Sequence, residues 1–85
     1  MVDVEPIVKI LSEIIDDRSV PRNIRTAAES AKKSLIEDMI NEWDVKLSSA
    51  ISVLDEITND PNMPGYTRTQ IWNVVSMLEL VKNKL

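Results

Sequence analysis

The chain contains one ten-residue segment twice: VKILSEIIDD at residues 8–17 and, 43 residues later, ISVLDEITND at residues 51–60. An apolar residue and a proline follow each copy, Val20-Pro21 and Met63-Pro64, and Arg25-Thr26 and Arg68-Thr69 then stand at matching distances. A fixed internal period of this length is typical of one supersecondary unit used twice, because a single unit cannot bury its apolar face alone. The repeat therefore predicts an architecture, whereas it indicates no activity.

Each copy predicts two helices, because apolar residues recur three and four positions apart and no segment alternates between apolar and polar residues. Prolines and capping residues set the expected ends. The four predicted helices run from an Asp3 cap to about residue 16, from Pro21 to between residues 37 and 40, from an Asn41 cap to about residue 59, and from Pro64 or a Thr67 cap to the last residues.

The inward faces of these helices follow from the same spacing. They comprise Val4, Ile7, Ile10 or Leu11, and Ile14; Ile24, Ala27, Ala28, Ala31 and Leu35; Leu47, Ala50 or Ile51, Leu54 and Ile57; and Ile71, Val74, Val75, Leu78, Val81 and Leu85. The alanines of the second set indicate close approach to a neighbouring helix. We predict an all-α fold, a compact four-helix bundle of two repeated α-hairpins. It forms one domain over residues 1–85, with repeat one at about 4–40 and repeat two at about 41–85, related by a pseudo-twofold axis or by a stacking step.

Composition narrows the function classes. The 85 residues carry 14 acidic and 10 basic side chains, a formal charge of -4, and the pI is about 4.7. This charge argues against binding to duplex nucleic acid and to anionic membranes, both of which require basic surfaces. No basic leader precedes an apolar run, and no apolar run approaches the ~18 residues of a membrane span. We therefore expect a soluble, cytoplasmic protein that binds neither nucleic acid nor membrane.

The residue types exclude most familiar catalytic sites. The chain has no histidine and no cysteine, so neither a Cys-His nor a Ser-His-Asp relay can form, and Gly65 alone cannot build a phosphate-binding loop. Carboxylates remain the only conventional acid–base groups. We expect no enzyme activity, no cofactor and no resident metal.

Two acid–arginine pairs stand at equivalent positions of the repeat. Asp17 and Asp60 each end the first helix of a hairpin, where an anion opposes the helix dipole, and Arg25 and Arg68 each follow eight residues later. We predict that each hairpin is closed by its own contact, Asp17 with Arg25 and Asp60 with Arg68. Alternatively, the aspartates cap the following helices by accepting backbone N–H bonds. A divalent-cation site is disfavoured, because the aligned acids are few and the arginines would compete.

The last helix carries more apolar residues than one inward face requires. Trp72, Met77 and Leu80 lie off the predicted core stripe, so they form a candidate interface if they remain exposed. The alternative is that the bundle buries this helix centrally, on all sides. The other aromatic residues, Trp43 and Tyr66, are more simply interpreted as packing residues.

The second repeat resembles the signature of an archaeal uncharacterised protein family, of the UPF type, over residues 54–64, 66–73 and 75–79. Residues 20–25, with Ala27-Ala28, are similar to the other motif of that family. The resemblance implies an archaeal origin and a small four-helix domain, and it implies no activity. A weaker likeness to HEAT-type helical repeats rests on residues 24–28. The spacing from aspartate to arginine is longer here, and the second copy has Gln70-Ile71 in place of the alanines.

These observations favour a non-catalytic protein–protein interaction module that associates with itself, as a homo-oligomer of at least two copies. The hypothesis depends on the missing catalytic residue types, the surplus apolar residues of the last helix and the acidic composition. The rival is a small-ligand or divalent-metal binding protein with a pocket between helices near Trp72, Tyr66 and the carboxylates.

Overall fold

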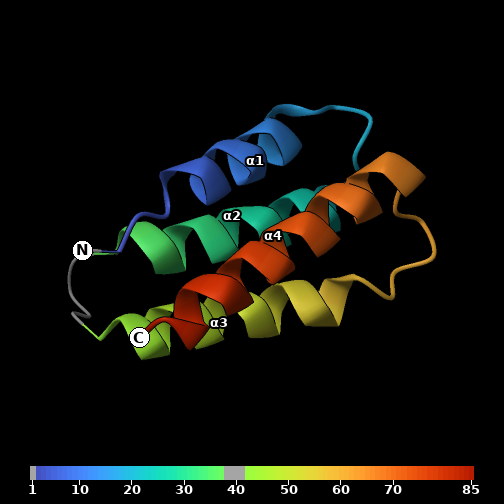
Figure 1. Ribbon diagram of the computed structural model, residues 1–85. Helices are drawn as coiled ribbons and strands as arrows, with labels where there is room; N and C mark the ends of the chain where they lie inside the picture. Colours follow the sequence, from blue (N-terminus) through green and yellow to red (C-terminus); the bar gives the residue numbers. More distant parts are fainter. Residues whose placement is uncertain (1, 38–41) are drawn as a thin grey trace.

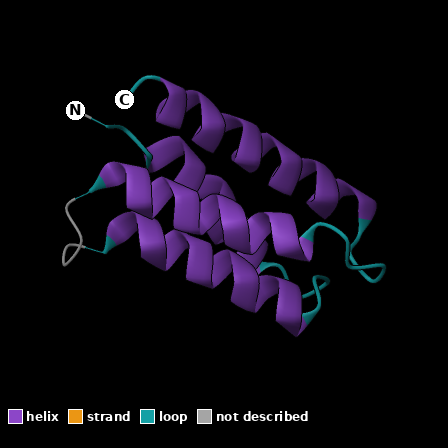
Figure 2. Ribbon diagram, turned by 90° about the horizontal axis from the view of Figure 1, so that it is seen from below, coloured by secondary structure: helices purple, strands orange, loops and turns teal. Residues whose placement is uncertain are grey.

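The fold is a bundle of four α-helices, shown by a computed structural model that describes residues 2–37 and 42–85 (Figure 1; Figure 2). The helices are α1 (Glu5–Asp16), α2 (Arg22–Ile36), α3 (Trp43–Ile57) and α4 (Gly65–Asn83). Over these residues the structure contains no β-strand. The predicted all-α bundle is confirmed.

Each helix contacts two others and lies diagonal to the third. α1 and α3 both pack against α2 and α4, and in the described ranges the diagonal pairs α1–α3 and α2–α4 make no close backbone contact. In Figure 1, α4 lies in front of α2, with α1 above it and α3 below. The α1–α2 and α3–α4 loops lie together at one end of the bundle, and both chain termini lie at the other.

The core is one cluster to which all four helices contribute. Five pairs of its fully buried residues match across the 43-residue period: Ile7 and Ala50, Leu11 and Leu54, Ala28 and Ile71, Ala31 and Val74, and Leu35 and Leu78. Three of these pairs combine an alanine with a larger residue, so the two hairpins contribute complementary volumes to a close-packed interior. The most extensive helix contact is between α2 and α3, which carry the buried alanines. This agrees with the close approach that the alanines predict.

The helix starts follow local signals in three cases. The residue at the N-cap of α1 is Val4 and not the predicted Asp3, but the Asp3 carboxylate still accepts the Glu5 backbone N–H at 3.1 Å. Pro21 and Pro64 precede α2 and α4 with nearly equal backbone angles, φ -56° with ψ 151° and φ -56° with ψ 145°. The alternative start of α4 at a Thr67 cap is wrong, because Thr67 lies inside the helix and is buried. The predicted Asn41 cap lies outside the described residues.

The C-terminal ends differ slightly from the prediction. α2 ends at Ile36 and α3 at Ile57, the latter two residues before the predicted position. Just beyond this end, the carbonyls of Thr58 and Asp60 accept hydrogen bonds from Arg68 of α4. Leu85 was predicted to face the core, but it lies beyond the end of α4 and is exposed.

Along the described parts of the chain, none of the helices has the length and apolar character that crossing a membrane requires.

Candidate functional site

The loop from α1 to α2 is held by its own polar groups. One oxygen of the Asp17 carboxylate, Oδ1, accepts the Ser19 hydroxyl at 2.6 Å and the Ser19 backbone N–H at 2.9 Å. These two bonds stabilise the charged carboxylate and so hold the pKa of Asp17 below its usual value. The Arg25 Nε–H, from the first turn of α2, donates to the Val20 carbonyl at 3.0 Å.

The loop from α3 to α4 is held by the equivalent residues, but here the arginine makes two hydrogen bonds where Arg25 makes one. The Asp60 carboxylate accepts the Asn62 backbone N–H at 2.8 Å. The guanidinium of Arg68 donates through Nη2 to the Asp60 carbonyl at 2.7 Å and through Nη1 to the Thr58 carbonyl. One arginine thus binds two carbonyls at the C-terminal end of α3, where a cation also complements the helix dipole.

The predicted carboxylate–guanidinium contacts are therefore replaced by other bonds of the same four residues. Both carboxylates, of Asp17 and Asp60, bind the residue two positions on, and both arginines, Arg25 and Arg68, bind loop carbonyls. An aspartate reaches that nearby amide without ordering a second long side chain, which favours the local turn over the ion pair. Neither aspartate caps the following helix, since α2 and α4 have no side-chain bond at their caps.

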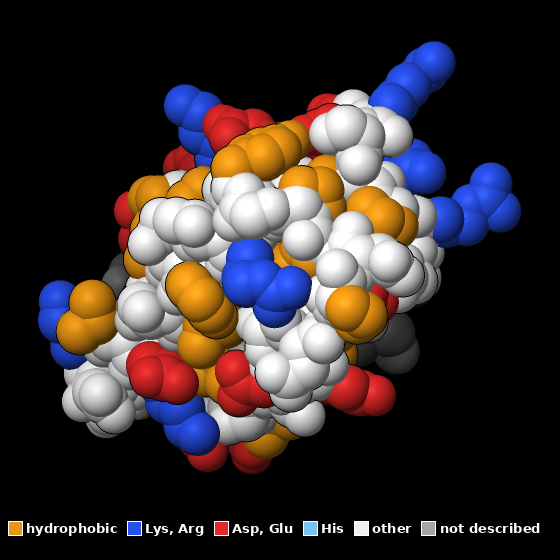
Figure 3. Space-filling view, turned by 90° about the vertical axis from the view of Figure 1, so that its right-hand side faces the viewer, with side chains coloured by type: hydrophobic (Ala, Val, Ile, Leu, Met, Phe, Trp, Pro, Cys, Tyr) orange, Lys and Arg blue, Asp and Glu red, His pale blue; other side chains and the backbone are white. Residues whose placement is uncertain are grey.

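One contact between the two hairpins was missed from the sequence. The second oxygen of the Asp60 carboxylate, Oδ2, accepts the Asn23 side-chain amide at 2.6 Å, which joins the start of α2 to the α3–α4 loop. The repeat could not indicate this bond, because Tyr66 occupies the position that matches Asn23 in the second copy. Figure 3 shows this end of the bundle, where basic, acidic and apolar side chains are interspersed.

The outer face of α4 carries two of the three predicted interface residues. Trp72 is 56% exposed and Leu80 is 61% exposed, although α4 already fills the core with other side chains. Met77 differs from the prediction: it is half-buried and packs against the core cluster. It follows Val74 by three residues, about 60° around the helix, and so lies on the flank between the core and outer faces.

The remaining aromatic residues have different environments. Trp43, at the start of α3, is half-buried, and the Lys46 ammonium lies 4.4 Å from the centre of its ring, a cation–π contact. This agrees with the packing interpretation of Trp43. Tyr66, in the first turn of α4, is instead 53% exposed, so it does not pack in the core.

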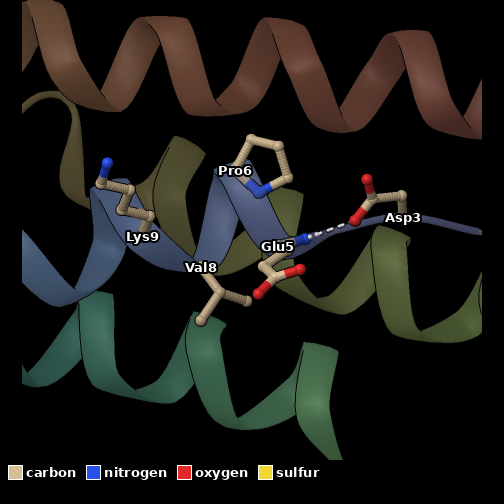
Figure 4. A pocket seen from close by; sticks show the side chains of 5 residues that line it. All are labelled: Asp3, Glu5, Pro6, Val8 and Lys9. Atoms are coloured by element: carbon tan, nitrogen blue, oxygen red, sulfur yellow. Dashed lines mark hydrogen bonds between the residues drawn. The ribbon is translucent and has the colours of Figure 1, made fainter.

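The surface is hollowed at the start of α1. This hollow has a volume of about 640 Å³, opens widely to solvent and is lined by Asp3, Glu5, Pro6, Val8 and Lys9 (Figure 4). Its lining includes neither Trp72 nor Tyr66, around which the rival hypothesis placed a pocket. Across residues 2–37 and 42–85, no group of three or more His, Cys, Asp or Glu side chains is arranged to hold a metal ion.

Known proteins resemble this chain over most of its length. The model of the uncharacterised protein family UPF0147 matches residues 3–81. A UPF0147 protein of Methanocaldococcus jannaschii is 58% identical over 73 residues, which cover 86% of this chain and 77% of the relative. A UPF0147 protein of Sulfurisphaera tokodaii is 51% identical over 74 residues, which cover 87% of this chain and 82% of the relative.

Two solved structures share the fold. A crystal structure of a protein of unknown function superposes with a TM-score of 0.85 at 50% identity, covering 89% of this chain and 85% of that one. A UPF0147 structure from Thermoplasma acidophilum superposes with a TM-score of 0.82 at 35% identity, covering 89% and 88%. The predicted resemblance to an archaeal uncharacterised family of small helical proteins is confirmed, and the chain belongs to the family UPF0147.

Proposed function

We propose that this protein is a non-catalytic, cytoplasmic interaction module that associates with itself through the outer face of α4. The observation that supports this most strongly is the exposure of Trp72 and Leu80 on one helix whose core face is complete without them. Tryptophan is among the residues that contribute most to protein–protein binding when an interface desolvates them. Its exposure on a helix in the free molecule therefore favours a contact surface.

The small size of the domain supports self-association as well. A chain of 85 residues buries a smaller fraction of its surface than a larger domain, and a second copy would remove further apolar surface from water. The non-catalytic part of the proposal is supported by the residue types. The chain has neither histidine nor cysteine, and hydrogen bonds within or next to the loops already occupy the carboxylates of Asp17 and Asp60.

Sedimentation equilibrium at 1 to 100 micromolar protein (about the range in which modest interfaces assemble) tests the proposal. We expect a mass above the 9.6 kDa of one chain, rising with concentration. Leu80→Ser should shift the population toward the single chain. Ile36→Ser is the matched control, because Ile36 on α2 is similarly exposed, at 55%, but lies on another helix.

Two outcomes would contradict the proposal. A single 9.6 kDa species of the wild-type protein at every concentration would exclude self-association in this range. A wild-type oligomer that Ile36→Ser disrupts and Leu80→Ser leaves intact would place the contact on α2 and not on α4.

A further inference from the structure

The exposed face of α4 has a symmetric order of side chains. Five exposed residues with successive spacings of three, four, four and three share this face, and we name them the α4 stripe: Thr69, Trp72, Ser76, Leu80 and Asn83. At 3.6 residues per turn, all lie within about 40° of a line through Ser76. Read from either end, the stripe is polar, apolar, small, apolar, polar.

This symmetry suits a second copy of the same helix in reverse direction. We propose that two copies of the protein pair their α4 stripes antiparallel, about a twofold axis that passes next to Ser76; the inference rests on the proposed self-association. Trp72 of one copy then lies level with Leu80 of the other, and Thr69 with Asn83, because each pair is equally far from the centre. The small side chain at position 76 lets the two helices approach closely.

A parallel pairing would use the stripe less well. It would place Trp72 level with Trp72 of the other copy, two large rings at one point of the helix contact, and Leu80 level with Leu80. It would also place Glu79 level with Glu79, and the C-terminal Lys82 and Lys84 level with their own copies. Like charges at such positions oppose association. In the antiparallel pair, Glu79 lies level with the neutral Asn73 and Lys82 with the neutral Gln70, and the one like-charged level pair is Lys84 with Arg68, whose guanidinium binds loop carbonyls.

The antiparallel arrangement also forms a closed dimer. A twofold contact uses the same patch on both copies, so it leaves no unmatched stripe to recruit a third chain. The apolar contact consists mainly of four large side chains, Trp72 and Leu80 from each copy, which is near the lower end of specific interfaces. We therefore expect a dimer that dissociates at micromolar concentration. Because each substitution acts twice, Trp72→Ala should raise the dissociation constant about a hundredfold.

Cysteine cross-linking determines the direction of the pairing. The natural chain has no cysteine, so each single variant carries one thiol. Thr69→Cys, Ser76→Cys and Asn83→Cys replace exposed polar residues seven positions apart on the stripe. A disulfide requires Cα atoms within about 7 Å. In the antiparallel dimer, residue 69 of one copy and residue 69 of the other lie on opposite sides of the centre. At 1.5 Å per residue they are about 20 Å apart along the helix axis, and the same holds for residue 83.

We expect Ser76→Cys to form a disulfide-linked dimer on mild oxidation, at protein concentrations where sedimentation shows the dimer. Thr69→Cys and Asn83→Cys should each stay unlinked alone and link to each other when mixed in equal amounts. Ser52→Cys, on the exposed face of α3, measures linking by random collision. Circular dichroism confirms that all variants keep the helix content of the wild type.

The outcomes separate the arrangement from the proposed function. Efficient linking of all three stripe variants, each with itself, would show a parallel pair and overturn this inference while leaving self-association intact. Linking at the collision level in every sample, with a dimer still present in sedimentation, would place the interface elsewhere and also overturn it. If no oligomer is found by sedimentation, the proposed function itself fails.

Discussion

Replacing Thr67 by valine should make this protein more stable. Thr67 lies in the first turns of α4 and is fully buried, and its hydroxyl has no hydrogen-bond partner among the described residues. Folding therefore removes this hydroxyl from water without replacing its hydrogen bonds. Valine has nearly the same shape and replaces the hydroxyl with a methyl group. The matching residue of the first repeat, Ile24, is apolar and equally buried.

The size of the effect follows from the unpaired hydroxyl. Mutational data indicate that burying such a group without a partner costs about 1–3 kcal/mol. Valine and threonine have similar helix propensities, so the backbone term is small. We expect Thr67→Val to raise the free energy of unfolding by about 1–2 kcal/mol. At about 4–8 °C per kcal/mol for a domain of this size, the midpoint of thermal unfolding should rise by about 5–15 °C.

Urea unfolding followed by circular dichroism measures this change. The slope of the free energy of unfolding against urea concentration should not change, which would indicate that the variant has the same folded and unfolded states as the wild type. Thr26→Val is the matched control. Thr26 is an exposed threonine of α2, outside the α4 stripe, so the free energy of unfolding of this variant should change little. Thr67→Ser keeps the hydroxyl and loses a buried methyl group, which should destabilise the protein by about 1 kcal/mol. A Thr67→Val protein no more stable than the wild type would refute the reasoning.

Three further predictions concern the loops and the hairpins. Arg68→Met removes hydrogen bonds to two carbonyls, so we expect it to lower the free energy of unfolding by about 1.5–3 kcal/mol in urea unfolding. Arg25→Met removes a bond to one carbonyl and should lower it by about half as much; equal losses would contradict the observed geometry. Because the folded-state pKa of Asp17 is lowered, its stabilising effect should be present above the unfolded-state pKa, about 3.9, and be lost as the pH falls through the folded-state value. Stability should therefore fall more steeply between about pH 5 and 2 for the wild type than for Asp17→Asn, and identical pH profiles would disprove this role. The fragments 1–40 and 41–85 should each be largely unfolded by circular dichroism and regain helicity when mixed, because each hairpin lacks the facing layer that buries its apolar residues; a cooperative thermal transition in either monomeric fragment would show that a hairpin folds alone.

The local signals of the sequence predicted the helices well. Apolar spacing gave their number and their buried faces, since the period of 3.6 residues is a property of each segment by itself. Pro21 and Pro64 marked the starts of α2 and α4, because proline fixes its own φ and lacks the N–H that a helix interior needs. The predicted C-terminal ends of α2 and α3 lay beyond the observed ones. α3 ends at Ile57, next to two carbonyls that accept hydrogen bonds from Arg68, a residue eleven positions further along the chain.

For the loops, the sequence indicated which residues matter but not which groups they bind. The repeat drew attention to Asp17, Arg25, Asp60 and Arg68, and each of them forms hydrogen bonds within or next to the loops. It could not give their partners, since a carboxylate and an arginine each have several possible bonds within reach. The Asn23–Asp60 hydrogen bond was harder to predict, because it joins residues 37 positions apart and has no counterpart in the other repeat.

The sequence by itself determined that four helices form, where the apolar stripe of each one lies, and that the chain lacks the residue types of most catalytic sites. These properties depend on residues close together in the chain and on composition. Only the tertiary structure decided which residues between the stripes are covered. Met77 is packed against the core, whereas Trp72 and Leu80 remain in solvent, because the neighbours α1 and α3 enclose the flanks of α4 and leave its outer face free. Burial depends on what lies on the other side of a residue, and the spacing within one helix does not contain that information.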